Sequence, residues 1–135
     1  MDGELRFGGS LDGFARRVEA HLRRRARTLF ALEVAEFGAR AGVRAAGVAV
    51  GDAATRWGSC SSAGRIRLSW RLVMASPEVR RFVIAHEVAH LRHLNHGPRF
   101  KALEAELVGS GLDDARRQLR LEGPRLRRLG LRRGR

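Results

Sequence analysis

The 135-residue sequence has no tyrosine, one cysteine and one lysine. Because Cys60 stands alone, the chain cannot form an internal disulfide or build a zinc ribbon from its own cysteines, and it fits a reducing compartment. No run of about 18 or more uncharged apolar residues occurs, so we expect no membrane-spanning helix and no membrane partner. The first residues also lack the apolar stretch of a signal peptide. Together these absences predict a protein of the cytoplasm.

Arginine, in contrast, is abundant. All of the 27 basic residues except Lys101 are arginine, and the formal net charge is +13. Residues 116–135 carry nine arginines against a single acid, Glu122, and so account for +8 of that charge. This concentration at one end favours a solvated basic tail, and a nucleic-acid-binding arm is the alternative.

Apolar periodicity and turn residues predict an α+β chain with a long N-terminal helix, a small sheet and a series of later helices. The long helix should end by Gly38 or Gly42, because glycine readily adopts the left-handed conformation that follows a helix. The expected elements are a helix over 11–37, a strand within 43–50, a hairpin that turns at 61–64 into a strand at 65–70, a helix from 77 through the histidines, a helix over 98–108 and a last helix over 113–121. We expect one domain over residues 1–122 and a basic, disordered tail over 123–135.

The segment HEVAH at residues 86–90 matches the His-Glu-x-x-His motif. Residues four apart lie one turn above each other on the same face of a helix, so the imidazoles of His86 and His90 can reach one ion. Glu87 is one step round the helix, where its carboxylate can act as general base for water at the metal. The alternative is a pair of hydrogen-bonded core histidines, but four of the five histidines fall within residues 86–96. The cluster favours a metal site.

Three candidates compete for the third ligand position. His93 continues the same helical face, but three ligands on one straight helix would span about 10 Å, too far for one ion. Glu104 or Glu106 could approach from the next helix. His96 requires the chain to turn back beneath the metal, which Gly97-Pro98 favours, and it also has the spacing of the extended His-Glu-x-x-His-x-x-Gly-x-x-His motif. We choose His96.

Two blocks of sequence, TRWGSCSSAGRIRLSWRL (55–72) and SPEVRRFVIAHEVAHLRHLNH (76–96), followed by HGPRF (96–100), resemble the YgjP-like metallopeptidase domain, which is related to the SprT-like and WLM zinc peptidases. The resemblance implies a minimal zincin-like fold with a small sheet beside the active-site helix. It also implies that His86, His90 and His96 bind one Zn²⁺ and that Glu87 is catalytic. In such a layout an edge strand can bind an extended peptide, and the strand at 65–70 is our candidate.

The absence of tyrosine leaves the stabilisation of a developing oxyanion to another group. The candidates for this contact with the substrate or transition state are Arg56, Arg71, His93 or a backbone N–H. We hypothesise that one of the two arginines has this role. Trp57 and Trp70 are interpreted as large core anchors for the small sheet.

The resulting hypothesis is a zinc-dependent metallopeptidase that hydrolyses polypeptide substrates, with water activated at one zinc ion and Glu87 as general base. One alternative is a nucleic-acid-associated binding protein in which zinc is structural. A combined alternative, suggested by the SprT-like kinship, is a DNA-dependent protease. Both alternatives would take their nucleic-acid contact from the basic C-terminal tail.

Overall fold

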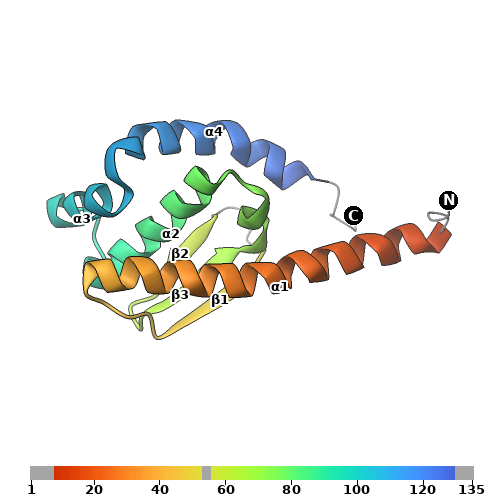
Figure 1. The fold of residues 1–135 in the computed structure, drawn as a ribbon, viewed down its shortest axis with the longest axis horizontal. Helices are drawn as coiled ribbons and strands as arrows, with labels where there is room; N and C mark the ends of the chain where they lie inside the picture. Colours follow the sequence, from red (N-terminus) through yellow and green to blue (C-terminus); the bar gives the residue numbers. More distant parts are fainter. Residues whose placement is uncertain (1–7, 53–55, 130–135) are drawn as a thin grey trace.

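The computed structural model of the chain describes residues 8–52 and 56–129. Its elements are α1 (Gly8–Ala41), β1 (Gly47–Gly51), β2 (Gly58–Cys60), β3 (Arg65–Ser69), the 3₁₀ helix η1 (Trp70–Met74), α2 (Pro77–Arg92), α3 (Pro98–Val108), the 3₁₀ helix η2 (Gly109–Gly111) and α4 (Leu112–Arg128). The expected α+β class is confirmed, and the arrangement of a small sheet beside the helix that carries His86 and His90 agrees with a minimal zincin-like fold (Figure 1). No helix within the described residues is long and apolar enough to cross a membrane.

Helix α1 is long and continuous, and its C-terminal part packs on the rest of the chain. The residues that it buries most deeply are Ala26, Phe30, Val34 and Phe37, which are spaced to share one helical face. The helix ends where Gly42 adopts a φ of 72°, and the N–H of Val43 donates to the carbonyl of Gly38 at 2.9 Å. This is a Schellman C-terminus, in which glycine adopts the left-handed conformation at no steric cost. Of the two predicted end points, Gly42 is the one used.

The sheet has the strand order β1-β3-β2, with β1 parallel and β2 antiparallel to β3. The predicted hairpin is confirmed: the N–H of Gly64 donates to the carbonyl of Ser61 at 3.0 Å, and Gly64 has a φ of 85°. The expectation that the strand at 65–70 is a free edge is wrong, because β3 is the central strand and both of its edges are paired. The edge strands of this sheet are β1 and β2.

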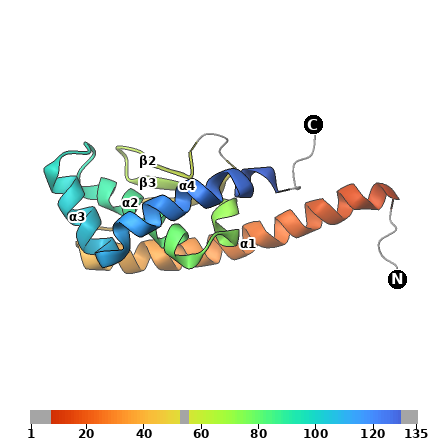
Figure 2. The same ribbon diagram turned by 90° about the horizontal axis from the view of Figure 1, so that it is seen from above.

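One face of the sheet packs on helices. Along β3, Ile66 and Leu68 are buried, whereas Arg65 and Arg67 are exposed on the other face. Helix α1 packs against β1, and α2 packs against β2, so the two helices lie side by side beneath the sheet (Figure 2). The buried core of the molecule includes Trp70, Leu72, Val79, Ile84, Val88 and Phe100. Strand β2 is therefore the edge strand closest to the helix that carries the histidines.

Helix α4 extends further than the sequence predicts. We expected disorder from Gly123 onward, and for residues 123–128 this is wrong, because α4 continues through Pro124 to Arg128. Gly123 and Leu126 are buried, and the carbonyl of Leu126 accepts a hydrogen bond of 2.8 Å from Nη1 of Arg71. These contacts outweigh the loss of one helical hydrogen bond at the proline. Leu129 is the C-cap of α4, and residues 130–135 of the expected tail lie outside the described residues.

Candidate metal centre

Helix α2 begins as the sequence predicts. The Ser76 hydroxyl accepts a hydrogen bond from the N–H of Val79 at 3.4 Å, and Pro77 occupies the first turn, where its missing N–H costs nothing. The N–H of Ser76 donates to Oε1 of Glu122 on α4 at 2.9 Å. The start of the site helix is therefore fixed both by its own cap and by a residue distant in sequence.

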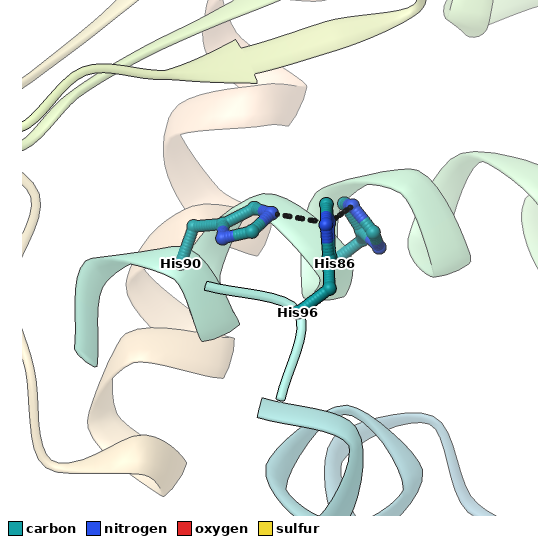
Figure 3. A group of neighbouring side chains, drawn as sticks. All are labelled: His86, His90 and His96. Carbon is teal, nitrogen blue, oxygen red and sulfur yellow. Dashed lines mark hydrogen bonds between the residues drawn. The ribbon is translucent and has the colours of Figure 1, made fainter. Parts of the chain in front are cut away.

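Three histidines converge at the other end of α2. His86 and His90 lie one turn apart on the helix, and His96 comes from the segment between α2 and α3 (Figure 3). Nε2 of His96 lies 2.9 Å from Nε2 of His90 and 3.4 Å from Nε2 of His86. One nitrogen from each ring lies within 4.8 Å of the other two. The three Nε2 atoms thus surround one point.

The end of α2 decides which histidines meet. The helix stops at Arg92, and His93 is its C-cap, with extended backbone angles and its N–H bonded to the carbonyl of Ala89. His93 consequently leaves the helical face of His86 and is not part of the cluster. The chain then turns through residues 94–97 before α3 begins, which places His96 over the end of α2.

In each of the two histidines on α2, Nδ1, the ring nitrogen that points away from the cluster, has a hydrogen-bonding partner. Nδ1 of His86 lies 2.7 Å from Oε2 of Glu104, and Nδ1 of His90 lies 3.0 Å from the carbonyl oxygen of His93. A carbonyl oxygen can only accept, so Nδ1 of His90 carries the proton and its Nε2 presents a lone pair to the cluster. Burial lowers the pKa of His90, which favours the same neutral form. An ionised Glu104 selects the same tautomer of His86.

Glu104 is a buried carboxylate at the centre of a polar chain. Its side chain is 1% exposed, and its second oxygen, Oε1, accepts a hydrogen bond from Nη2 of Arg116 at 2.9 Å. Burial acts to raise the pKa of Glu104, but the hydrogen bond with His86 and the charges of His86 and Arg116 together lower it. The sequence made Glu104 an alternative third ligand. The structure instead places it behind the ring of His86, where carboxylates commonly orient metal-binding histidines.

Phe100 forms one wall of the cluster. Its ring stacks on His90 at a centroid distance of 4.4 Å and meets His86 and His96 edge-on at 5.0 and 4.8 Å. It is 2% exposed, so it shields the rings from solvent on that side. Its contact with all three histidines depends on how α3 packs on α2, so the local sequence does not reveal this role.

Glu87 lies between α2 and β2, outside the three-histidine group. Burial raises the pKa of Glu87, and the charges of His86 and Arg56 partly oppose that rise. A Cβ on Gly58 of β2 would lie 3.0 Å from Cγ and 3.1 Å from Oε2 of Glu87. Glycine at this position therefore lets the edge strand approach the carboxylate closely.

The other predicted contacts occupy different places. Arg56 is exposed two residues before the start of β2, and its charge acts on Glu87. Arg71 is buried, and its guanidinium donates to Oδ1 of Asp52 at 3.0 Å and to the carbonyl of Leu126 at 2.8 Å. Of the two arginines, only Arg56 is free of hydrogen-bonded partners among the described residues. His93 contributes its backbone carbonyl to the support of His90.

The donor set fits a divalent transition metal, because three imidazole nitrogens with fixed tautomers face one point. No curated protein and no protein of solved structure matches the sequence. The family described as "YgjP-like, metallopeptidase domain" matches residues 8–122, which include Glu87, Glu104 and the three converging histidines. The chain belongs to the YgjP-like metallopeptidase domain family.

Proposed function

We propose that this metallopeptidase domain is a zinc-dependent peptidase in which His86, His90 and His96 hold one Zn²⁺ and Glu87 is the general base. The observation that carries the proposal is the convergence of three Nε2 atoms beside a buried carboxylate that is not itself one of the converging groups. When bound, zinc supplies a Lewis acid that polarises a peptide carbonyl and lowers the pKa of water.

The number of protein ligands supports catalysis over a purely structural metal. Structural zinc sites have four protein ligands, whereas catalytic sites have three and keep one position for water or substrate. In the part of the chain that the structure describes, the group of converging ligands contains three histidines and no fourth residue. The alternative of a binding protein with a structural zinc is therefore less well supported.

Glu87 moves the proton in the proposed reaction. Its carboxylate accepts a proton from the attacking water and delivers it to the nitrogen of the leaving amine. Burial raises the pKa of Glu87, which strengthens it as a base, and the charge of Arg56 keeps part of the ionised form available. Arg56 is also our choice for the oxyanion contact, because the guanidinium of Arg71 is already bound to Asp52 and Leu126.

Strand β2 supports a place for an extended polypeptide substrate. The N–H of Ser69 donates to the carbonyl of Trp57, and the N–H of Ser61 donates to the carbonyl of Arg65, so Trp57 and Ser61 face β3. Alternation along a strand then directs the backbone groups of Gly58 and Cys60 away from β3, towards the free edge. A peptide that pairs with this edge would lie beside Glu87.

Metal analysis and a cleavage assay test the proposal together. His96→Ala should lose zinc, whereas Glu87→Gln should keep zinc and lose turnover on casein or a peptide library by a factor of about 10² to 10⁴. The matched control is His21→Ala, which removes the one histidine outside residues 86–96, an exposed residue of α1, and should change neither property. Full cleavage by Glu87→Gln would rule out the assigned base.

The oxyanion assignment has its own test. Arg56→Ala should lower kcat with little change in zinc content, because the lost contact would form only in the transition state. Arg71→Ala should act mainly on stability, because that side chain joins Asp52 to the end of α4. If both variants keep full turnover, neither arginine stabilises the oxyanion.

A further inference from the structure

The N-terminal part of α1 projects beyond the rest of the fold, at the end remote from α3 (Figures 1 and 2). Between Leu11 and Arg25 only Glu19 is buried, and the other side chains are exposed or half-buried. The regular burial that anchors this helix begins at Ala26. A helix of this kind gains little from packing, so its side chains are available to a partner.

The projecting part and the first anchored turn after it carry arginines on one side of α1. Arg17, Arg24 and Arg27, hereafter the arginine stripe, are exposed and alternate with the exposed residues Ala20 and Ala31 at steps of three or four residues. Such steps keep all five on one side of a helix. Asp12 does not lie on the side of the stripe. It is five full helical turns before the buried Phe30 and therefore lies on the packed side of α1. The stripe therefore presents positive charge without an acid beside it.

None of the three arginines of the stripe has an ion pair or hydrogen bond within residues 8–52 and 56–129. This distinguishes them from the structural arginines of the molecule. Arg23, only one residue away, is paired with Glu19 at 2.8 Å, and Arg116 is bound to Glu104 at 2.9 Å. The fold thus leaves the stripe with charge that no described group neutralises.

The shape and charge of the stripe fit double-stranded DNA. Alanines between the arginines let the helix axis approach a surface closely, and the major groove of B-form DNA is wide enough to admit an α-helix. The narrow major groove of A-form RNA is not. A membrane-surface helix would need a broad apolar face, yet the large apolar side chains exposed on the projecting part are Leu11 and Phe14 alone among the described residues.

We propose that the arginine stripe binds the phosphate backbone of double-stranded DNA without sequence preference. Arg125 and Arg128 on the last turns of α4 are exposed at the same end of the molecule and add to its positive potential (Figure 1). The inference is independent of catalysis, since the histidine cluster lies near the opposite end of α1, where α2 meets α3.

Fluorescence anisotropy with a labelled duplex of about 20 base pairs tests the proposal between about 50 and 200 mM salt. Replacement of all three stripe arginines by glutamine should weaken binding at least about tenfold. The slope of log K against log salt should become less negative by about 2 to 3, because each lost phosphate contact removes about 0.9. The corresponding lysine triple variant, Arg17→Lys with Arg24→Lys and Arg27→Lys, should bind like wild type, because the phosphate contact needs charge rather than a fork geometry.

The matched control removes the same charge elsewhere. Arg44, Arg65 and Arg99 are exposed, without side-chain partners among the described residues, and lie outside the projecting part of α1. Their glutamine triple variant should bind within about threefold of wild type, because it leaves the stripe intact. Circular dichroism would check that both triple variants are folded.

Four results would overturn the proposal. These are no binding of the duplex by wild type at low salt, equal losses in the two glutamine triple variants, preferential binding of duplex RNA, and binding of vesicles with anionic phospholipid in place of DNA. Equal losses would mean that net charge rather than the stripe drives binding. Because the assay measures no cleavage, its failure would leave the proposed peptidase activity unaffected, and the reverse also holds.

Discussion

The two ends of the molecule use arginine in different ways. At the metal-site end, Arg116 binds the carboxylate of Glu104, which in turn holds the ring of His86. At the projecting end, the arginine stripe has no partner among the described residues. The two groups cannot be told apart from amino-acid composition. Their contacts distinguish them: some arginines support a site, and others are available to a ligand. Substitutions at the first end should alter metal binding or stability, and substitutions at the second should alter only ligand binding.

The largest expected contrast lies along α1 itself. Phe30 is fully buried, whereas Phe14 is 50% exposed on the projecting part. Phe30→Ala should lower the free energy of unfolding by about 3–5 kcal/mol, through lost burial and the cavity left behind. Phe14→Ala should change it by less than about 0.5 kcal/mol. Urea denaturation of both variants measures the difference, and equal losses would show that the projecting part is packed after all.

The second prediction concerns the support of His86. Glu104→Gln keeps the shape of the side chain but removes the charge that fixes the ring, so zinc affinity should fall by a factor of about 10 to 100. Competition with a chelating dye measures the dissociation constant. Glu106→Gln is the matched control, because Glu106 is exposed on the same helix. The zinc affinity of this variant should equal that of wild type. Unchanged affinity in Glu104→Gln would mean that the ring holds its position without the carboxylate.

The sequence predicts the helix at 77–92 and the convergence of its histidines with His96 better than it predicts the residues that surround them. The start of α2 at Ser76-Pro77 and the spacing of His86 and His90 are local features, and the turn at Gly97-Pro98 indicates that His96 returns to the helix end. The roles of supporting groups depend on contacts between elements. Glu104 appears in sequence as one more acid on a helix, and only the packing of α3 on α2 brings it to His86.

The sheet and α4 show the same limit of local information. Strand β1 pairs with β3 in parallel, across intervening β2, and no turn signal encodes such a nonlocal pairing. This pairing is the reason that β3 is central and cannot be the free edge. In α4, Gly123-Pro124 has the local signature of a helix end, but burial of Leu126 carries the helix onward. In both cases tertiary packing overrides local preference.

The third prediction tests whether β2 positions the carboxylate of Glu87, the proposed general base. In Gly58→Ala the new Cβ would approach Cγ of Glu87 and Cδ2 of Leu68 to 3.0 Å, so one of them must move. Turnover should fall by about tenfold, about 1.4 kcal/mol, with zinc content unchanged. Gly47→Ala is the matched control, because a Cβ there meets nothing within 4 Å and β1 lies at the other edge of the sheet. Equal turnover in both variants would show that Glu87 tolerates the displacement.

The smallest expected effect concerns how α4 fixes the start of the site helix. Burial acts to raise the pKa of Glu122, but the N–H of Ser76, with Gln118 and Arg125, lowers it overall. Because the folded pKa lies below the unfolded value of about 4.3, ionised Glu122 stabilises the fold above that pH, and the contribution is lost as the pH falls through the folded pKa. Glu122→Gln should therefore cost about 1 kcal/mol or less at neutral pH and nothing in strong acid.

Thermal denaturation of wild type and Glu122→Gln from neutral pH down to about pH 3 measures this difference. The two Tm curves should converge as the carboxyl is protonated, because the variant lacks only the charge. Equal Tm values at neutral pH would mean that the shape of the side chain, which glutamine keeps, holds Ser76 without the charge. Convergence would show that a charge on α4 stabilises the start of the helix that carries the histidines, whereas the arginine stripe has no such partner among the described residues.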